Sequence, residues 1–257
     1  MVLGTSFAKS ELMSLAARVK MLEVNLCHGA NLSLCHLPNF PDFAQGAFPV
    51  PSLTSTTSVN YQRTHPVLWP FGKLLRFPRS PTHNSPHLAL HSSTQFNNCF
   101  RLGRVYGHLG VAFPVPIMIT HVTIDHLMDG ELSHMKEAPR EMVLWGLVEG
   151  AVNFARHASS LPYNVSTEAP VDTPPEDITA AVEAINPQSF FIALARFEYD
   201  IVRGTCPVQT FSVRDIIKES QMDFGVVVLE VRENWGSNDT CLYRMRIHGR
   251  AAELEEQ

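Results

Sequence analysis

The chain has 257 residues, 45% of them hydrophobic, which can support a core for one large domain or two small ones. Its formal net charge of -5 and pI near 6.2 give no support for nucleic-acid binding as the main activity. No window approaches the roughly 18 apolar residues of a membrane span. Charged residues interrupt every apolar run near the N-terminus, so no signal-peptide h-region is predicted there. As written, the chain is expected to be soluble.

Apolar residues near the N-terminus recur at alternating spacings of three and four. They are Leu12, Leu15, Val19, Leu22 and Leu26. This spacing covers about two heptads and predicts a short helix with a seam for a partner helix, as in a coiled coil. The alternative is an amphipathic helix that packs on its own domain, because two heptads are marginal alone.

The rest of the chain shows short strand patterns separated by turn residues. Residues 38–100 are rich in Pro, Ser, Thr, Asn and His and predict loops and short strands. An acidic, Pro-rich insertion covers residues 149–188, where Asp177 is predicted to cap a short helix through Ile185. Strands are predicted over 115–126, 141–148, 190–199, 208–213, 224–231 and 242–247. Without a βαβ rhythm, the pattern favours an antiparallel β-sandwich with a short N-terminal helix.

Residues 224–249 carry the clearest period-2 alternation. Val227, Leu229 and Val231 share one face of the first strand, and Met245 and Ile247 share one face of the second. Such alternation is typical of a sheet with one face buried. With a short polar connection between the strands, the segment is predicted to be a hairpin.

The sequence contains few motifs that would indicate catalysis or metal binding. The twelve histidines form no HxxxH or His-x-His pair, and the five cysteines form no CxxC pair, so no metal site is predicted. No GxSxG elbow and no Gly-rich phosphate loop before a helix occur. Cys99 or Cys241 as a nucleophile remains an alternative to a buried structural cysteine. The chain is therefore predicted not to be an enzyme.

Three Asn-x-Ser/Thr sequons begin at Asn31, Asn164 and Asn238. Since one or two arise by chance in a chain of this length, they lean only weakly towards a secretory or lumenal compartment.

An ordered set of motifs covers roughly residues 39–250. The longest is NWGSNDTCLYRMRIHG at 234–249. Upstream of it lie PDFA (41–44) with PSLTS (51–55), NNCF (97–100), VTIDH (122–126), APRE (138–141) leading to Gly146, FEYD (197–200) and VQTF (208–211). In this order the motifs closely resemble those of the SUN domain, whose closing hairpin the segment 234–249 resembles, and the long insertion resembles that of fungal members. The resemblance implies a galactose-binding-like β-sandwich over 39–257, with residues 1–38 as a helical stub and coiled-coil remnant.

The resemblance also implies a function. SUN domains are homotrimeric, non-enzymatic adaptors of the LINC complex, and they face the perinuclear space from the inner nuclear membrane. There they bind the C-terminal tails of KASH proteins and so link the nuclear envelope to the cytoskeleton. The tail adds a strand against a lid, which corresponds here to residues 58–76. Its terminal carboxylate enters a pocket that would use His126 and Tyr243. No nucleic acid and no small-molecule substrate is implied.

Further positions follow from the resemblance. Cys99 and Cys241 fall where the family has its internal disulfide, which requires an oxidising compartment. The loop 88–98 matches the family's monovalent-cation loop, with His91, Ser93 and Asn98 at the positions of interest and Ser93 where the family has an acid. No other cofactor is implied.

Several positions depart from the family pattern. The pocket's second tyrosine is replaced by Asp239 on a turn that is one residue shorter, and an acid there would repel a ligand carboxylate. Thr54 stands where some members have a cysteine that cross-links to the tail, so no covalent clasp is expected. Cys206 has no counterpart and is predicted to be unpaired. The membrane span that precedes the domain in family members is absent from this chain.

Two alternatives to the tail-binding adaptor remain open. One is a secreted β-sandwich that binds glycans, with Tyr61, Trp69 and Phe71 as exposed aromatic residues on a loop rim. The other is a truncated or mis-spliced relative without function, suggested by the lost tyrosine and the missing span.

Overall fold

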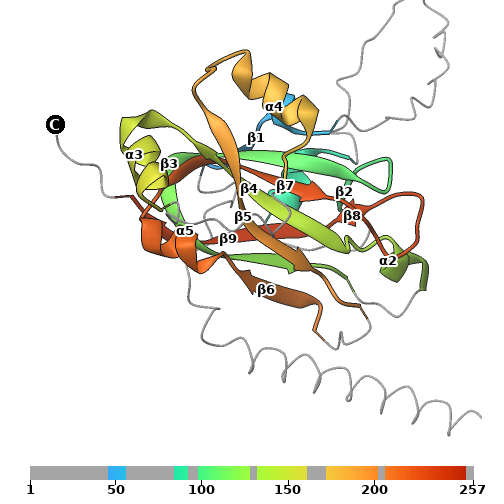
Figure 1. Ribbon diagram of the computed structural model, residues 1–257. Helices are drawn as coiled ribbons and strands as arrows, with labels where there is room; N and C mark the ends of the chain where they lie inside the picture. Colours follow the sequence, from blue (N-terminus) through green and yellow to red (C-terminus); the bar gives the residue numbers. More distant parts are fainter. Residues whose placement is uncertain are drawn as a thin grey trace, which may run out of the picture.

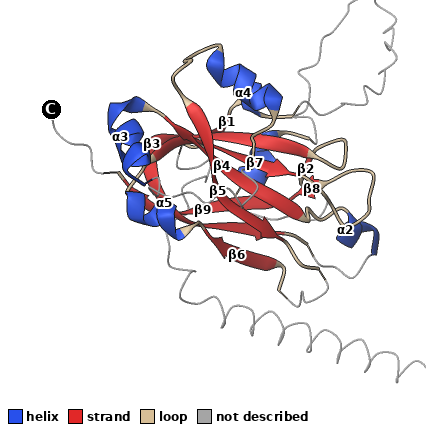
Figure 2. Ribbon diagram, in the orientation of Figure 1, coloured by secondary structure: helices blue, strands red, loops and turns tan. Residues whose placement is uncertain are grey.

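The computed structural model describes residues 46–55, 84–91, 98–127, 132–160, 172–201 and 206–252. The predicted N-terminal helix, the lid 58–76 and the aromatic residues proposed for a glycan rim lie outside these ranges. The strands make up the body of the molecule and the short helices lie at its margins (Figures 1 and 2). All pairings between strands are antiparallel, as the sequence predicted.

Strand β3 (Gly107–Asp125) organises the sheet because it takes part in both layers. Its first part pairs with β1 (Phe48–Pro49) and β7 (Phe224–Val231), and β7 continues to β4 (Glu141–Val148) and then β5 (Phe190–Glu198). Its second part pairs with β6 (Val208–Ser212) on one side and β9 (Arg244–Ala251) on the other. A two-stranded sheet of β2 (Phe100–Arg101) and β8 (Cys241–Leu242) completes the strands.

The change of layer falls at two prolines. The pairing of β3 with β7 runs regularly to Ala112 and resumes only at Ile117, so Pro114 and Pro116 lie in the irregular interval. Proline has no N–H to donate to a ladder, and it is therefore tolerated in a strand where pairing is interrupted. A strand that bends in this way can serve two packed sheets. The prolines thus allow one strand to close the sandwich.

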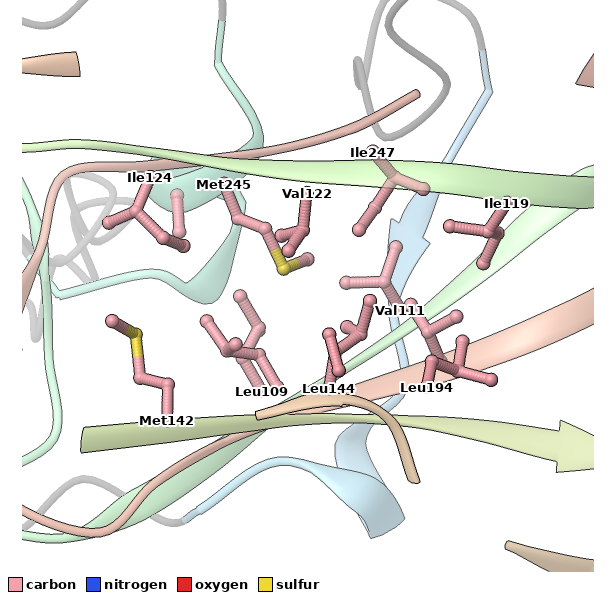
Figure 3. Packing of buried hydrophobic residues seen from close by; sticks show 14 of the residues in the cluster. Leu109, Val111, Ile119, Val122, Ile124, Met142, Leu144, Leu194, Met245 and Ile247 are labelled. Carbon is pink, nitrogen blue, oxygen red and sulfur yellow. The ribbon is translucent and has the colours of Figure 1, made fainter. Parts of the chain in front are cut away.

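The main core lies between the two layers. Ile119, Val122 and Ile124 of β3 lie with Met245 and Ile247 of β9 on one side of it. Facing them are Leu109, Val111, Met142, Leu144 and Leu194 from the other layer, as Figure 3 shows. These residues are at most 2% exposed. The period-2 alternation in β3, β7 and β9 therefore does point one set of apolar side chains inward.

A second apolar cluster covers the outer face of the first layer. Helix α4 (Glu176–Glu183) places Ile178 and Val182 against Val143, Trp145 and Val228. The sheet is consequently buried on both faces here, and β4 accordingly carries buried apolar residues on both of its faces. The remaining helical segments are η2 (Pro51–Leu53), η3 (Pro86–Leu90), α2 (Leu132–Lys136), α3 (Gly150–Ser160) and α5 (Asp215–Ser220).

Three predictions about the elements need correction. The segment 224–249 is not a hairpin: β7 and β9 do not pair with each other, and each pairs with a different part of β3. The described parts of the insertion 149–188 contain α3, which was not predicted, in addition to the predicted short helix, which is α4. Finally, Asp177 does not cap α4. Pro175 holds the N-cap position, while Asp177 lies in the first turn and its Oδ1 accepts from the N–H of Ile178.

Candidate functional site

The disulfide between Cys99 and Cys241 ties β2 to β8 at one end of the sandwich. The two Cα atoms are 5.6 Å apart and 142 positions separate the residues. The register of β2 and β8, with Arg101 opposite Cys241, places the bond at a point where the backbones already meet. Cys99, Cys241 and Tyr243 form a buried cluster, with Leu127 packed against it. In the chain-entropy description, closing a loop of this length stabilises the fold by roughly 5 kcal/mol.

Tyr243 lies where the last strand is interrupted. It falls between β8 and β9, and only 3% of it is exposed. Its ring meets the ring of His126 edge to face, with centroids 5.1 Å apart. The structure therefore brings together the two residues that the resemblance assigned to one pocket.

His126 directly follows β3 and is held on two sides. Its backbone N–H donates to the carbonyl of Pro207 at 2.8 Å, and its Nε2 lies 3.0 Å from the carbonyl oxygen of His134. The imidazole is 3% exposed. Its position is thus fixed by backbone on either side, which suits a residue that must present one ring edge in a defined direction.

A second tyrosine belongs to the same group. Tyr199 lies next to His126, with ring centroids 6.1 Å apart, and its hydroxyl donates to the carbonyl of Pro207 at 3.0 Å. Burial raises the pKa of Tyr199, and the nearby charge of Asp125 raises it further. Sequence reasoning missed this residue as part of the site, although the FEYD motif contains it. The family's second tyrosine was sought only in the closing turn, where Asp239 stands.

Asp239 does not face an open site. One carboxylate oxygen accepts the backbone N–H of Gly103 at 2.7 Å, and the other lies 3.1 Å from Nη1 of Arg101. Arg101 also forms two hydrogen bonds to Glu137, at 3.2 and 3.0 Å. Burial alone would lower the pKa of Arg101, but its bonds to Glu137 and Asp239 outweigh this effect and raise it. The charge of Asp239 is therefore paired with Arg101 of the same chain, at a partly exposed position.

The closing turn is built by Asn234. Its Oδ1 accepts from the backbone N–H groups of Gly236 and Ser237, and its Nδ2 donates to the carbonyl of Asp239 and to the hydroxyl of Thr240. Gly236 has a φ of 106°, a conformation that only glycine adopts readily. The turn thus has a fixed shape that carries Asp239 towards Gly103.

The first and third residues of the sequon at Asn238 differ in exposure. Asn238 is exposed, whereas Thr240 is completely buried and its hydroxyl donates to the carbonyl of Val105 at 2.7 Å. A glycan on Asn238 would leave from the surface of the turn. Asn31 and Asn164 lie outside the described residues.

The remaining predicted positions are only partly described. Ser93 of the cation loop lies outside the described ranges, His91 directly follows η3, and Asn98 precedes Cys99. Thr54 is 8% exposed and its hydroxyl donates to the carbonyl of Val50. Within the ranges given above, no three His, Cys, Asp or Glu side chains gather as a metal site. Cys206 was predicted to be unpaired, and this is wrong, because Cys206 is disulfide-bonded.

The comparisons with known proteins support the motif resemblance. Residues 162–251 match the family model "Sad1 / UNC-like C-terminal". The chain is 28% identical over 99 residues to human SUN domain-containing protein 5, which covers 38% of this chain and 24% of that protein. It is 22% identical over 173 residues to Sun domain-containing protein 1 of Dictyostelium discoideum, covering 67% of this chain and 16% of that protein. The resemblance to the SUN family is confirmed, and the chain spans less than a quarter of these relatives.

Solved structures with some likeness include a family 32 carbohydrate-binding module of Streptococcus pneumoniae EndoD. That likeness has a TM-score of 0.45 at 9% identity and covers 83% of this chain and all of the module. Allantoicase of Saccharomyces cerevisiae gives a TM-score of 0.44 at 9% identity, covering 84% of this chain and 44% of the enzyme. Likenesses this distant carry no information about ligands. In the described part of the chain, no helix is both long and apolar enough to cross a membrane.

Proposed function

We propose that this chain, whose residues 162–251 match the SUN family, is a non-enzymatic adaptor that binds the C-terminal tail of a KASH protein. The observation that carries the proposal is the contact of His126 with Tyr243 beside the Cys99–Cys241 disulfide. The three features come from separate parts of the chain and meet at one end of the sandwich. As a member of the LINC complex, the chain would act as a homotrimer in the perinuclear space and link the nuclear envelope to the cytoskeleton.

The hydroxyl of Tyr243 would donate to the terminal carboxylate of the tail, while His126, whose Nε2 donates to the carbonyl of His134, would orient the Tyr243 ring. Hydrogen bonds from neutral donors to an ionised carboxylate are worth more than bonds between neutral groups. Asp239 was expected to oppose this by repulsion. Because Arg101 and Gly103 already hold its carboxylate, the repulsion is reduced by an internal cation. The proposed pocket would therefore offer the Tyr243 hydroxyl as a donor without an unpaired acid beside it.

Binding is tested with one labelled KASH-tail peptide in two forms, with a free carboxylate and with a C-terminal amide. Fluorescence anisotropy of the full chain should show clearly weaker binding of the amide. Replacing Tyr243 by Phe should raise the Kd of the free-acid peptide about tenfold, the loss expected for one hydrogen bond to a charged group. The same replacement should leave the Kd of the amide peptide nearly unchanged.

Tyr106→Phe is the matched control, since it removes the same hydroxyl from an exposed tyrosine elsewhere on the surface. It should leave tail binding unchanged. Equal affinity for the acid and the amide, with no effect of Tyr243→Phe, would contradict the proposed pocket. Tail binding that survives deletion of residues 58–76 would contradict the placement of the lid.

A further inference from the structure

A cavity of about 430 Å³ lies on the molecule away from His126 and Tyr243. It is bounded by the loop before β3, the start of α4 and the end of β7. Its lining includes Arg104, Tyr106, His108, Asp177, Glu230 and Arg232. Most of these side chains are polar, which is unusual for a gap left by imperfect packing of apolar surfaces.

The wall formed by β7 is held rigidly. Oε2 of Glu230 accepts from the indole N–H of Trp145 at 2.9 Å, and Oε1 lies 3.2 Å from Nε of Arg232. Arg232 in turn bonds to Asp172 at 2.9 Å. Each oxygen of Glu230 has capacity for a second hydrogen bond. The carboxylate is thus fixed in place and still able to accept from a ligand.

The opposite wall is formed by His108. The residue is 8% exposed; its Nδ1 lies 3.4 Å from the hydroxyl of Ser55 and its Nε2 lies 3.6 Å from Asp177. Burial lowers the pKa of His108, and the charges of Asp177 and Glu230 only partly offset this. At neutral pH the imidazole is therefore uncharged, with one nitrogen as donor and one as acceptor.

The charges that line the cavity balance one another. Arg104 and Arg232 contribute two positive charges, and Asp177 and Glu230 contribute two negative ones. A ligand with a strong charge of either sign would gain little from such a lining. A neutral ligand that offers several donors and acceptors close together would match it.

An aromatic ring stands at the edge of the cavity. Tyr106 is 59% exposed, and the guanidinium of Arg104 lies 5.5 Å from its ring centroid. A large aromatic side chain left this exposed beside a polar cavity offers an apolar platform of the kind found at binding surfaces. The platform and the fixed polar wall together favour a flat ligand with apolar faces and a polar edge.

We propose that this cavity binds a neutral saccharide. A pyranose ring would lie against Tyr106 with its C–H face, while its hydroxyls would meet Glu230, His108 and Arg232. A pyranose has both required features, since its axial C–H groups form an apolar face and its hydroxyls both donate and accept. The proposal is independent of tail binding, because it uses none of the residues beside the disulfide.

The test uses saturation-transfer NMR on the full chain with methyl glycosides of glucose, galactose, mannose and N-acetylglucosamine. At least one should receive saturation in its ring protons. Tyr106→Ala should raise the Kd of that glycoside by roughly tenfold, because the stacking surface is lost. Tyr106→Phe keeps the ring and should bind as the unmodified chain does. Glu230→Gln should also weaken binding, by removing the charged acceptor.

Tyr106 is exposed, so its replacement should leave the thermal unfolding midpoint unchanged, and this is checked in parallel. The proposal is overturned if no glycoside in the panel binds, or if Tyr106→Ala binds as well as Tyr106→Phe. A further arm presents the bound sugar on a carrier protein. Tighter binding there assigns a protein-linked glycan as the natural source, and equal binding assigns a free sugar.

Discussion

The ion pair between Asp239 and Arg101 changes how the charge of Asp239 is interpreted. Arg101 is 138 positions away in the chain, so no local pattern connects the two. In the structure, Arg101 bridges the carboxylates of Asp239 and Glu137 and so joins the closing turn to the chain just before β4. Since all three side chains are partly exposed, the ion pairs themselves contribute little to stability. Their role is to fix where the charge of Asp239 is directed.

Gly110 illustrates a residue required for a close approach. A Cβ built on it would lie 2.4 Å from Cβ of Leu53 and 2.6 Å from the Leu53 carbonyl oxygen. Gly110→Ala must therefore displace the η2 turn from β3, and we expect it to lower the free energy of unfolding by roughly 1–3 kcal/mol. Urea denaturation measures the difference.

Gly225→Ala is the matched control for this substitution. The nearest atom to a Cβ there is an oxygen of Glu149 at 4.0 Å, which is ordinary contact. The control should change stability by less than about 1 kcal/mol. If both substitutions cost the same, the close approach of Leu53 to Gly110 is not what the glycine serves.

At the scale of elements, helix α4 acts as a cover for the sheet. Ile178 is fully buried against the outer face that Trp145 and Val228 present. Ile178→Ala should cost about 2–5 kcal/mol, because it leaves a cavity between the helix and the sheet. Thermal or urea unfolding of the full chain provides the measurement.

Ile185 supplies the comparison for that prediction. It follows the same helix but is 80% exposed, so Ile185→Ala should stay within about 0.5 kcal/mol of the unmodified chain. Similar losses from the two substitutions would mean that α4 is not packed on the sheet. The result matters for the saccharide proposal as well, since α4 also carries Asp177 at the cavity.

The bounds of a strand could be predicted where its own sequence shows a clear hydrophobic pattern. The predicted bounds of β4 and β7 agree with the structure, since each is an apolar run with clear ends. The predicted pairing of β7 with β9 was wrong, because period-2 alternation identifies a strand but does not show which strand it pairs with. The bend at Pro114 and Pro116 lets β3 pair with β7 before the prolines and with β9 after them. This bend depends on tertiary packing and could not be predicted from the local pattern. Helix α3 was missed within a stretch that looked like one insertion.

The candidate site was predictable to a similar degree. His126 and Tyr243 were placed through motif resemblance, and the structure puts them in contact. Tyr199 and Arg101 were missed because their roles arise from neighbours distant in sequence. The cavity at His108 was not foreseen either, since its lining comes from four separate stretches of chain.

At the scale of the whole molecule, one buried and two half-buried histidines determine how the free energy of unfolding should depend on pH. Burial is the main cause that lowers the pKa of His108, His121 and His157 below 6.5. As pH falls through 6.5, the unfolded chain takes up protons on these residues before the folded chain does. The free energy of unfolding should therefore be lower at about pH 5.5 than at about pH 7.5.

Two carboxyl groups act in the opposite direction. Burial raises the pKa of Asp125 and Glu149 above their ordinary values of 3.8 and 4.5, so their contribution to stability is lost as pH rises rather than as it falls. Urea unfolding at the two pH values provides the test, and His108→Gln should reduce the difference. A chain that is equally stable or more stable at the lower pH would show that these histidines are protonated in the folded state.

The disulfide has a consequence for how the chain responds to cutting. It joins β2 to β8 across 142 positions, so most of the sandwich lies within the loop it closes. A protease that hydrolyses one peptide bond anywhere in that loop leaves two fragments that are still covalently linked. Such a nicked molecule keeps its full mass until it is reduced, and its fragments stay at high effective concentration for one another. A protein anchored through either end would remain a continuous mechanical link after the cut.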